Sequence, residues 1–485
     1  MPSYKTPGVY IEEISTLPPS VAVVSTAVPA FIGYTAKKPE DRQDDDLSSK
    51  AVRISSLLEY VELFGEAAAQ IMKIEAKKLK IDQTTSIEIG WSGMRPTIPD
   101  FLLYHSIQLY FANGGGPCYI YSLGEYPYKK NRDGSEETNL IIPNPDDFTA
   151  AITDLESVDE PTLLVFPDSV LLTDEKHGNV IDAALVSCQK TQNRFTIADI
   201  REAIPDKTDT PDKVKSNART HIKSEFLMHG SLYFPYVETL IPFAYSDENV
   251  ILVKYEEPTT TNAAPTDKEL SDIVDTDTEV YTAVKSFLSM ANVTLPVSGA
   301  IAGVYCQVDR TRGVWKAPAN VGLALVSGPT VKITDDLQDD LNIDPATGKS
   351  VNVIRSFTGR GTLVWGARTL ADNDNEWKYI SARRFANFVE DSIGKSIISF
   401  AFHPNDANTW TRVRAMVENF LTTLWRDGAL MGTKPEHAFH VSIGLGKTMT
   451  ADDILNGRMI LVVHLAIVRP AEFTILKFIQ KMQES

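Results

Sequence analysis

The chain has 485 residues, of which 43% are hydrophobic and 23% are charged, and its formal net charge at pH 7 is -17. This length exceeds one ordinary domain, so we expect two or three domains with substantial cores. The acidic balance argues against a nucleic-acid binder and against docking on an anionic membrane, because either role needs a basic face.

No stretch reaches the roughly eighteen uncharged apolar residues that a membrane span requires. The N-terminal region has no basic segment followed by an apolar one, so no signal peptide is indicated and the cytosol is the expected compartment. Cys118, Cys188 and Cys306 are widely spaced and form no CxxC pair. We therefore expect three buried hydrophobic cysteines, no disulfide, no zinc site and no cofactor.

The first part of the chain predicts an extended arm followed by alternating strands and helices. Residues 1–20 hold a short strand-like run between prolines, and residues 21–35 read as the first core strand. Helical spacing of apolar residues predicts a helix over 52–64, with Ser55 or Ser56 as its cap. A second helix is predicted over 100–112 with Asp100 as its N-cap, followed by a strand over 117–123.

From about residue 125 the pattern is that of βαβ units. The predicted strands are 162–166, 194–199 and 231–237, and the predicted helices cover 150–155 and 180–190. The second helix places four apolar side chains on one face: Ile181, Ala184, Leu185 and Cys188. Helices between strands indicate a parallel sheet covered on both faces.

Residues 296–370 are dense in glycine and arginine, which predicts tight turns and close backbone approaches and no regular element. Two amphipathic helices follow, over 376–393 and 407–425. Basic side chains lie off their apolar stripes, which predicts a basic face on each helix, although an ordinary solvated face explains such residues equally. These side chains are Lys378, Arg383, Arg384, Arg412 and Arg426.

The C-terminal stretch holds two apolar runs separated by Pro470. The first, 457–469, predicts a strand buried on both faces, because its apolar residues do not alternate. The second run includes Phe473, Ile475 and Phe478, which is too apolar for a free tail. Either the body of the chain or a neighbouring subunit that accepts it as an added strand must cover it.

Several motifs were weighed for chemistry, and none indicates catalysis. GLGKT at 444–448 lacks the first glycine of a phosphate-binding loop, where Val441 stands. The three histidines His403, His437 and His440 have no acidic partner at metal-site spacing. Asp168, His229 and Ser298 are the best available triad, but no GxSxG elbow is present.

Motifs spread over nearly the whole chain resemble the contractile tail sheath family of contractile phages, R-type bacteriocins and extracellular contractile injection systems. They are PGVYIEEI at 7–14, FANGGGPCY at 111–119, SGAIAGVYCQVDRTRGVWKAPAN at 298–320, GRGTLVWGARTL at 359–370, WKYISARRF at 377–385, LWRDGALMG at 424–432 and RPAEFTILKFIQ at 469–480.

The resemblance implies a mixed α+β chain of the α/β class. Its implied parts are an N-terminal linking arm over 1–20, an inner sheath domain whose first part is 21–125, a subtilisin-like α/β middle domain with polar insertions over 126–354, an inner C-terminal domain over 355–470 and a C-terminal linking arm over 471–485. The middle domain is expected to lack a protease triad, so the chain is expected not to be an enzyme.

The resemblance also implies a force-generating subunit that polymerises as stacked hexameric rings around an inner tube and contracts to drive that tube through a target envelope. Its implied partners are copies of itself, the inner tube, baseplate and terminal cap proteins, and paralogous sheath subunits. Assembly is expected in a bacterial cytoplasm, within a phage tail or a released phage-tail-like particle.

Two groups of residues are implied to make the contacts between subunits. The linking arms hold Val9, Tyr10, Ile11, Glu12, Phe473, Thr474, Ile475, Leu476, Phe478 and Ile479, which complete a small sheet in a neighbour. The five basic side chains named above are expected to contact the tube. The competing hypothesis is a hydrolase or ligand-binding protein that uses the parallel-sheet cleft near Asp168 and Asp199.

Overall fold

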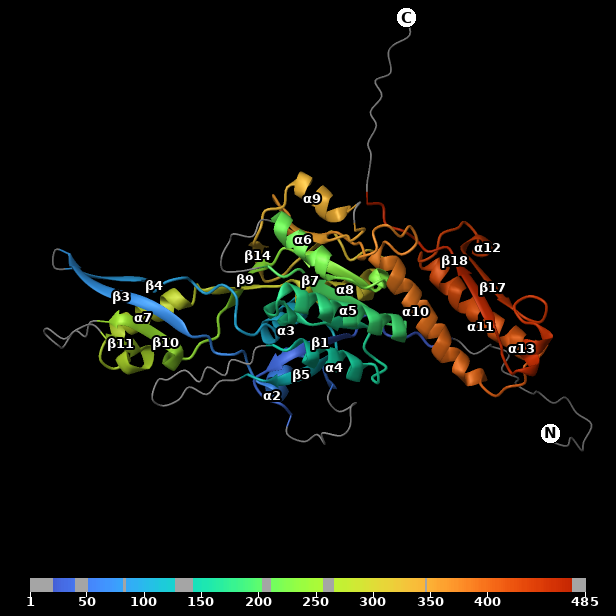
Figure 1. Cartoon of the computed structure of the whole chain (residues 1–485), viewed down its shortest axis with the longest axis horizontal. Helices are drawn as coiled ribbons and strands as arrows, with labels where there is room; N and C mark the ends of the chain where they lie inside the picture. The colour runs from blue at the N-terminus through green and yellow to red at the C-terminus, as the bar shows by residue number, and fades with distance from the viewer. Residues whose placement is uncertain are drawn as a thin grey trace, which may run out of the picture. The chain divides into compact units, whose positions relative to one another are not determined.

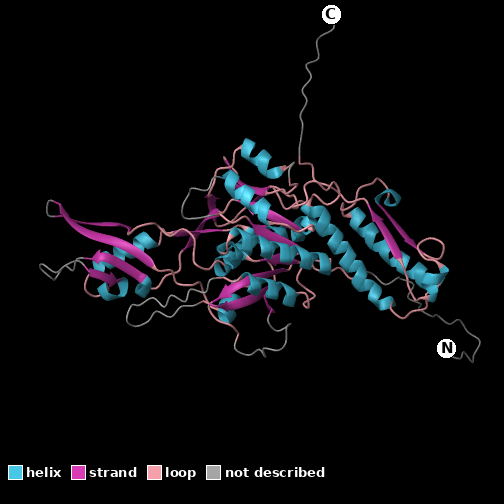
Figure 2. Cartoon of the chain, in the orientation of Figure 1, coloured by secondary structure: helices cyan, strands magenta, loops and turns pink. Residues whose placement is uncertain are grey.

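The computed structural model describes residues 21–39, 51–81, 84–126, 143–202, 211–255, 266–344 and 347–472. The chain divides into two compact units (Figure 1). Unit 1 comprises Met1–Val24 and Val389–Val468, and unit 2 comprises Ser25–Phe388 and Arg469–Ser485. The predicted arm residues at 9–12 and 473–479 lie outside the described residues. The predicted mixed α/β class is confirmed, with several separate sheets (Figure 2).

Unit 2 is built on a nine-stranded sheet in the order β13-β16-β15-β8-β7-β6-β1-β5-β2. The strands from β15 to β5 run parallel, and β2, β16 and β13 add antiparallel edges. This confirms the predicted parallel sheet. The strand bounds are β1 Pro29–Thr35, β2 Ala51–Ile54, β5 Cys118–Glu125, β6 Leu163–Val165, β7 Phe195–Asp199, β8 Gly230–Phe234, β13 Val321–Gly322, β15 Asn352–Phe357 and β16 Gly361–Trp365.

The main-chain ladder of this sheet is continuous past residues 125 and 354. Strand β1 pairs with β5 on one side and with β6 on the other, so strands from both sides of residue 125 share one sheet. Strand β15 itself spans residue 354. The division of the chain into inner and middle sheath domains stays a prediction.

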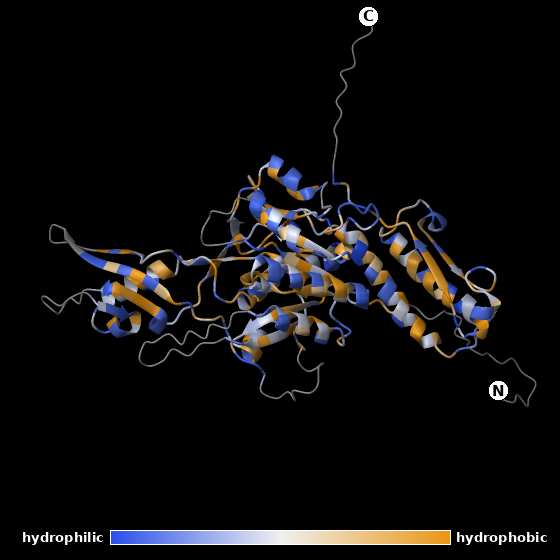
Figure 3. Ribbon diagram, viewed as in Figure 1, coloured by the Kyte–Doolittle hydropathy of each residue, from blue (hydrophilic) through white to orange (hydrophobic). Residues whose placement is uncertain are grey.

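Each face of the sheet buries its own core, because successive side chains of a strand point to opposite faces. Phe31 and Val165 join one buried cluster, and Ile32 and Leu164 join the other. Helices α3 and α8 cover the first face, and α4 and α5 cover the second; apolar residues concentrate in these layers (Figure 3). The helices around the sheet are α2 Leu57–Phe64, α3 Leu103–Ala112, α4 Pro145–Leu155, α5 Asp174–Thr191, α6 Pro211–His221, α8 Ser298–Arg312 and α9 Asp335–Asn342.

Helix α8 corrects the prediction that the glycine-dense block holds no regular element. It is a buried helix of 15 residues that packs against α3. A Cβ atom on Gly299 would lie 2.5 Å from the Ser106 carbonyl oxygen, and one on Gly303 would lie 2.5 Å from that of Tyr110. The glycines therefore serve a close contact between two helices, which is the predicted close backbone approach in a different setting.

The two predicted helix caps have different outcomes. Ser56 caps α2 by accepting a hydrogen bond from the Glu59 amide. Asp100 does not cap α3, because Leu102 is the N-cap residue and makes no side-chain cap bond. The Leu102 amide donates instead to the carboxylate of Asp168, which lies 66 positions further along the chain. Sequence spacing around the helix start contains no sign of that partner.

Two smaller sheets complete unit 2. The lysine-rich stretch near 75–80, which the sequence left unplaced, belongs to a long hairpin of β3 and β4 in a four-stranded sheet, order β11-β10-β3-β4. A three-stranded sheet has the order β12-β9-β14. The bounds are β3 Met72–Ile81, β4 Thr84–Trp91, β9 Val237–Pro242, β10 Val250–Tyr255, β11 Thr266–Glu269, β12 Asn292–Leu295, β14 Val326–Pro329, α7 Thr278–Leu288, and the 3-10 helices η1 Pro167–Leu171, η2 Leu227–His229, η3 Asp247–Asn249 and η4 Leu270–Ile273.

Unit 1 contains the helix α11 and a two-stranded sheet of β17 and β18. Helix α10 begins within the residues of unit 2 and ends within those of unit 1. Asp406 caps α11, and the predicted apolar stripe of this helix is buried at Val413, Val417 and Leu421. Both predicted long helices are confirmed. The bounds are α10 Ile380–Ile397, η5 Ile398–Phe400, α11 Ala407–Arg426, α12 Pro435–Ala438, β17 Phe439–Ile443, α13 Ala451–Leu455 and β18 Leu461–Leu465.

Candidate functional site

The sheet of unit 1 has room for further strands. Strands β17 and β18 are antiparallel, with Val441 opposite Val463, and α11 packs against β17. Among the described residues the two strands form no sheet with any other strand. The predicted burial of β18 on both faces is wrong, because Leu461–Leu465 is half-exposed and His464 is exposed. Edge strands offer unpaired main-chain groups to another chain, so this sheet is a candidate acceptor.

Main-chain hydrogen bonds hold the segments that flank this sheet. The Met431 amide donates to the Ala466 carbonyl at 2.7 Å, and the Ala466 amide donates to the Ala438 carbonyl at 2.8 Å. The chain after β18 is therefore held within unit 1 as far as Val468, whose amide donates to the Ala429 carbonyl. A two-stranded sheet alone is marginally stable, and these bonds with the α11 packing supply its support.

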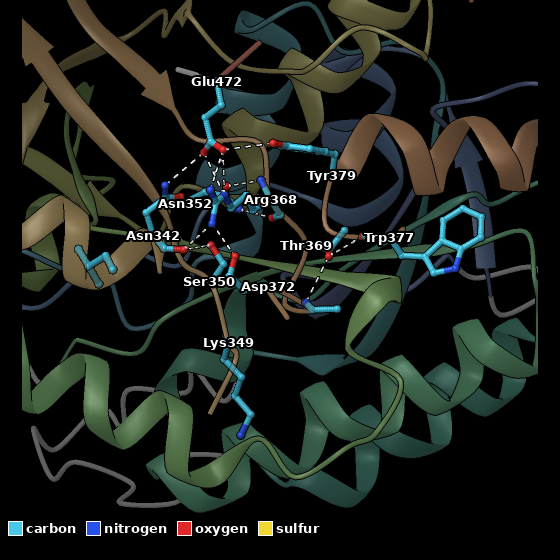
Figure 4. A network of polar contacts seen from close by, with 12 residues as sticks. Asn342, Lys349, Ser350, Asn352, Arg368, Thr369, Asp372, Trp377, Tyr379 and Glu472 are labelled. Atoms are coloured by element: carbon cyan, nitrogen blue, oxygen red, sulfur yellow. Dashed lines mark hydrogen bonds and ion pairs between the residues drawn. The ribbon is translucent and has the colours of Figure 1, made fainter. Parts of the chain in front are cut away.

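A second candidate site is the polar network around Arg368, which lies in unit 2 (Figure 4). Asn352 fixes the backbone there: its Oδ1 accepts from the Arg368 amide and its Nδ2 donates to the Arg368 carbonyl, both at 2.8 Å. Gly366 leaves room for this, since a Cβ on it would lie 2.7 Å from Asn352 Oδ1. These bonds fix the backbone of Arg368 independently of the contacts of its side chain.

The guanidinium of Arg368 binds two carboxylates. Its Nε lies 2.9 Å from Glu472 Oε1 and its Nη2 lies 2.7 Å from Glu472 Oε2, which is a forked ion pair, and its Nη1 binds Asp372. Only 4% of the Arg368 side chain is exposed, against 22% for Glu472. Asn342 Nδ2 and the Tyr379 hydroxyl also donate to Glu472, at 3.2 and 3.4 Å.

The electrostatics of this network favour the charged arginine. Burial alone would lower the pKa of Arg368, but the hydrogen bonds and charges of Glu472 and Asp372 outweigh it and raise that pKa. None of the three residues Arg368, Asp372 and Glu472 was predicted as a site residue from the sequence. The available signal was one acidic residue, Glu472, two positions after Pro470 in an otherwise apolar stretch.

The predicted basic faces are only partly present. Arg383 and Arg384 are 3% and 4% exposed, so the prediction of exposed basic side chains is wrong for both. Arg384 forms a buried ion pair with Asp309 at 2.6 Å and donates to the Thr26 carbonyl at 2.9 Å. Arg383 stacks on Trp377, with 4.2 Å from its guanidinium carbon to the ring centroid. A helix face that meets another helix buries whichever side chains lie on it, and periodicity alone does not identify that neighbour.

The other three basic residues are available at the surface. Arg412 and Arg426 are exposed on α11, and Lys378 is half-exposed before α10 with its Nζ 5.4 Å from the centroid of the Tyr379 ring.

Two carboxylates that follow strands of the parallel sheet bind main-chain amides of the chain itself, and a small cavity beside Asp199 is lined by His177 and Arg201 among others. Asp168 accepts from the amides of Leu102 at 2.6 Å and Tyr34 at 2.8 Å, and Asp199 accepts from those of Val297 and Ser298, both at 2.9 Å. Each therefore caps the start of a helix, α3 or α8. A Cβ on Gly33 would collide with the Asp168 carboxylate. These positions, where a ligand would bind in an open cleft, hold the protein's own main chain.

Burial raises the pKa of both carboxyls, to about 6 for Asp168 and about 7 for Asp199, although the amide donors work in the opposite direction. The structure does not assemble the tentative triad. His229 bonds to Gln189 at 2.8 Å, while Asp168 and Ser298 have the separate partners described above. Burial also lowers the pKa of His229 to about 4.

The remaining motifs show no ligand site. His403, His437 and His440 are exposed, and His440 bonds to Ser442 at 2.9 Å. GLGKT forms the turn after β17, with positive φ at Gly444 and Gly446. Within the described ranges, no group of three metal-ligating side chains is present, and no helix is both long and apolar enough to cross a membrane.

Comparison with known proteins shows extensive similarity to sheath proteins. A family model of the phage tail sheath C-terminal domain matches residues 372–481. The tail sheath protein of Burkholderia phage BcepMu is 29% identical over 144 residues, and that of Vibrio phage KVP40 is 23% identical over 130. These matches span 29% and 27% of this chain, and only 30% and 19% of the lengths of the two curated relatives.

Solved structures extend the similarity to the whole chain. The sheath of the extracellular contractile injection system PVC, in its contracted state, is 30% identical, with 99% of each chain covered and a TM-score of 0.63. The contracted helical sheath of the anti-feeding prophage is 32% identical, covers 99% of this chain and 100% of that one, and has a TM-score of 0.61.

Proposed function

The chain belongs to the contractile tail sheath family and is a structural subunit of a contractile sheath, and we propose that it is the force-generating element of that sheath. In this proposal the subunits polymerise as stacked hexameric rings around an inner tube, and their contraction drives the tube through a target envelope. The observation that carries the proposal is the similarity, over 99% of the chain, to sheaths solved in the contracted state.

We assign the acceptor role in polymerisation to the two-stranded sheet of β17 and β18. The arms of neighbouring subunits, Val9–Glu12 and Phe473–Ile479, add to it as strands. The exposed edges and the half-buried face of β18 support this assignment.

The energy of such a link is sufficient for a permanent connection. About five main-chain hydrogen bonds contribute roughly 0.5 to 1.5 kcal/mol each. Burial of a few large apolar side chains adds about 1.5 to 3 kcal/mol each, and ordering the arm takes back part of this. The link therefore persists while weaker contacts between subunit bodies exchange.

We further propose that the exposed side chains of Arg412 and Arg426 and the half-exposed side chain of Lys378 contact the inner tube. Charged side chains at a wet interface give orientation more than affinity, which suits a contact that must release when the sheath contracts. Arg383 and Arg384 are left out of this contact, since both are buried in unit 2.

Baseplate and terminal cap proteins, and paralogous sheath subunits, complete the proposed assembly. One solved relative, 32% identical, is a component of the anti-feeding prophage baseplate. We propose assembly in a bacterial cytoplasm, as part of a phage tail or of a particle released from the cell. The hydrolase or ligand-binding alternative is not supported, because Asp168 and Asp199 are engaged by main-chain amides.

The test is assembly of the purified chain. Negative-stain microscopy of the intact chain is expected to show striated hollow cylinders. A chain ending at Glu472 keeps every described contact and lacks the C-terminal arm, so it is expected to give the circular dichroism spectrum of the intact chain but no cylinders. If the shortened chain unfolds, the arm belongs to its own core; if it polymerises normally, the arm is not the link.

A further inference from the structure

The feature that carries a further inference is the attachment of Glu472 to Arg368. Glu472 is the last residue that the structure describes, and it lies immediately before the proposed C-terminal arm. Its carboxylate accepts hydrogen bonds from three residues, Arg368, Asn342 and Tyr379 (Figure 4). The Arg368–Glu472 pair is partly buried, so it is less screened than an ordinary surface ion pair.

We propose that Arg368 is a positioning residue that anchors the base of the C-terminal arm to unit 2, so that residues 473–485 start from a fixed point. This inference rests on the proposed sheath function, because an anchor matters only if the arm binds a neighbouring subunit. The anchor consists of Arg368, Asp372 and Glu472, and we call it the arm anchor.

The charge balance of the arm anchor indicates which member serves the arm. Arg368 and Asp372 lie four residues apart, have side chains 4% and 6% exposed, and already neutralise each other. The fold therefore does not need Glu472 to compensate a buried cation. Glu472 adds a second, forked carboxylate from the far end of the chain, and its removal leaves the buried pair intact.

The anchor also determines the point at which the proposed arm begins. The Val468 amide is bonded within unit 1, and Glu472 is bonded within unit 2. Without the Glu472 contact the free segment begins after Val468 and gains four residues, up to about 14 Å of reach. A longer, less oriented tether lowers the effective concentration of the arm at its acceptor. Fixing its base therefore favours polymerisation without any contact to the neighbour.

The primary test is the variant Glu472→Ala in the full-length chain. Its critical concentration for polymerisation, measured by light scattering, is expected to rise at least about tenfold, because tenfold corresponds to ordering only one of the four released residues again when the arm binds. Hydrogen exchange of the amides of Arg469, Ala471 and Glu472 is expected to accelerate in the unpolymerised chain. Arg368→Lys keeps the charge but loses the fork, so an intermediate effect is expected.

Glu160→Ala is the matched control, because Glu160 also binds an arginine and a tyrosine elsewhere in unit 2: Arg53 at 3.3 Å and the Tyr119 hydroxyl at 2.6 Å. It is expected to change neither the critical concentration nor exchange of the amides around Glu472. Unchanged exchange and unchanged polymerisation in Glu472→Ala would overturn the anchor. Loss of its cooperative unfolding transition would also overturn it, since Glu472 would then serve the body fold. If the wild-type chain forms no polymer while exchange accelerates in the variant, the sheath function fails and the attachment of Glu472 stands.

Discussion

At the scale of a single residue, Asp199 has a structural role at the carboxyl end of the parallel sheet, because its carboxylate binds main-chain amides. Its carboxylate lies at the end of β7 and accepts two amides at the start of α8. Burial raises its pKa to about 7 from an ordinary value of 3.8. The folded chain therefore holds a proton between about pH 4 and pH 7 that the unfolded chain has lost.

This proton predicts a pH dependence with a definite sign. Because the folded-state pKa is raised, the contribution of Asp199 to the free energy of unfolding is largest at low pH and is lost as the pH rises from about 4 to about 7. The slope is at most about 1.4 kcal/mol per pH unit. In Asp199→Asn this contribution is absent, so the stability lost by the variant is expected to be greater at pH 4.5 than at pH 7.5.

Urea unfolding of both chains across this range measures the difference. The wild-type chain must be compared with the variant at each pH, because the buried histidines change the free energy of unfolding with pH in the opposite direction. Burial lowers the pKa of His105, His177 and His229 to about 4, so their contribution is lost as the pH falls below about 6.5. A wild-type-to-variant difference that stays constant from pH 4.5 to 7.5 contradicts the assignment.

At the scale of elements, the contact between α3 and α8 depends on glycine. Gly303→Ala places a Cβ atom 2.5 Å from the Tyr110 carbonyl oxygen, so the helices must separate. We expect a loss of about 1 to 3 kcal/mol in the free energy of unfolding, even though alanine favours helices more than glycine does. Thermal or urea unfolding of the purified variant measures it.

Gly394→Ala is the control for helix propensity. Gly394 lies in α10, and a Cβ there would meet no atom within 4 Å. This change is expected to leave stability unchanged or raise it by up to about 1 kcal/mol. Equal effects of the two substitutions would show that propensity, and not the close approach of α8 to α3, governs Gly303.

The contact between α3 and α8 illustrates why sequence patterns predicted some elements of the fold and not others. Helices with one apolar stripe, such as α11, and buried parallel strands, such as β7, have periodicities that depend only on the local chain. Helix α8 is buried on all sides from Ser298 to Cys306 and has glycines where α3 approaches it, so its sequence showed no helical periodicity and predicted turns. The β3–β4 hairpin alternates lysine with apolar residues in a stretch too polar to stand out.

The candidate sites also differ in whether the local sequence or a distant part of the chain determines them. Strand β18 follows from a local apolar run, although its burial was overestimated, and its partner strand β17 was not predicted. The arm anchor joins Arg368 to Glu472, 104 positions along the chain, and no local pattern encodes such a pairing. Arg384 was misplaced for a related reason: Asp309 and Thr26 lie on segments that only the fold brings together. Arg383 has the local partners Trp377 and Asn387, and their spacing did not identify it as buried.

At the scale of the whole molecule, net charge opposes assembly. Each subunit carries a formal charge of -17, so copies repel one another. The proposed links use main-chain hydrogen bonds and apolar burial, which salt does not weaken. Raising the ionic strength from about 20 mM to about 150 mM shortens the screening length to about 8 Å and reduces the repulsion. Polymerisation of the sheath chain alone is therefore expected to become faster with added salt.

The proposed tube contact predicts the opposite salt dependence. Lys378, Arg412 and Arg426 would meet an acidic inner tube through exposed charges, which salt screens. Binding of the tube protein to sheath subunits is thus expected to weaken over the range in which sheath polymerisation improves, as measured by light scattering and co-sedimentation. Arg412→Ala is expected to reduce this salt effect on tube binding and to leave polymerisation of the sheath alone unchanged. If salt instead dissolves the sheath, charged contacts and not the arms dominate the links between its subunits.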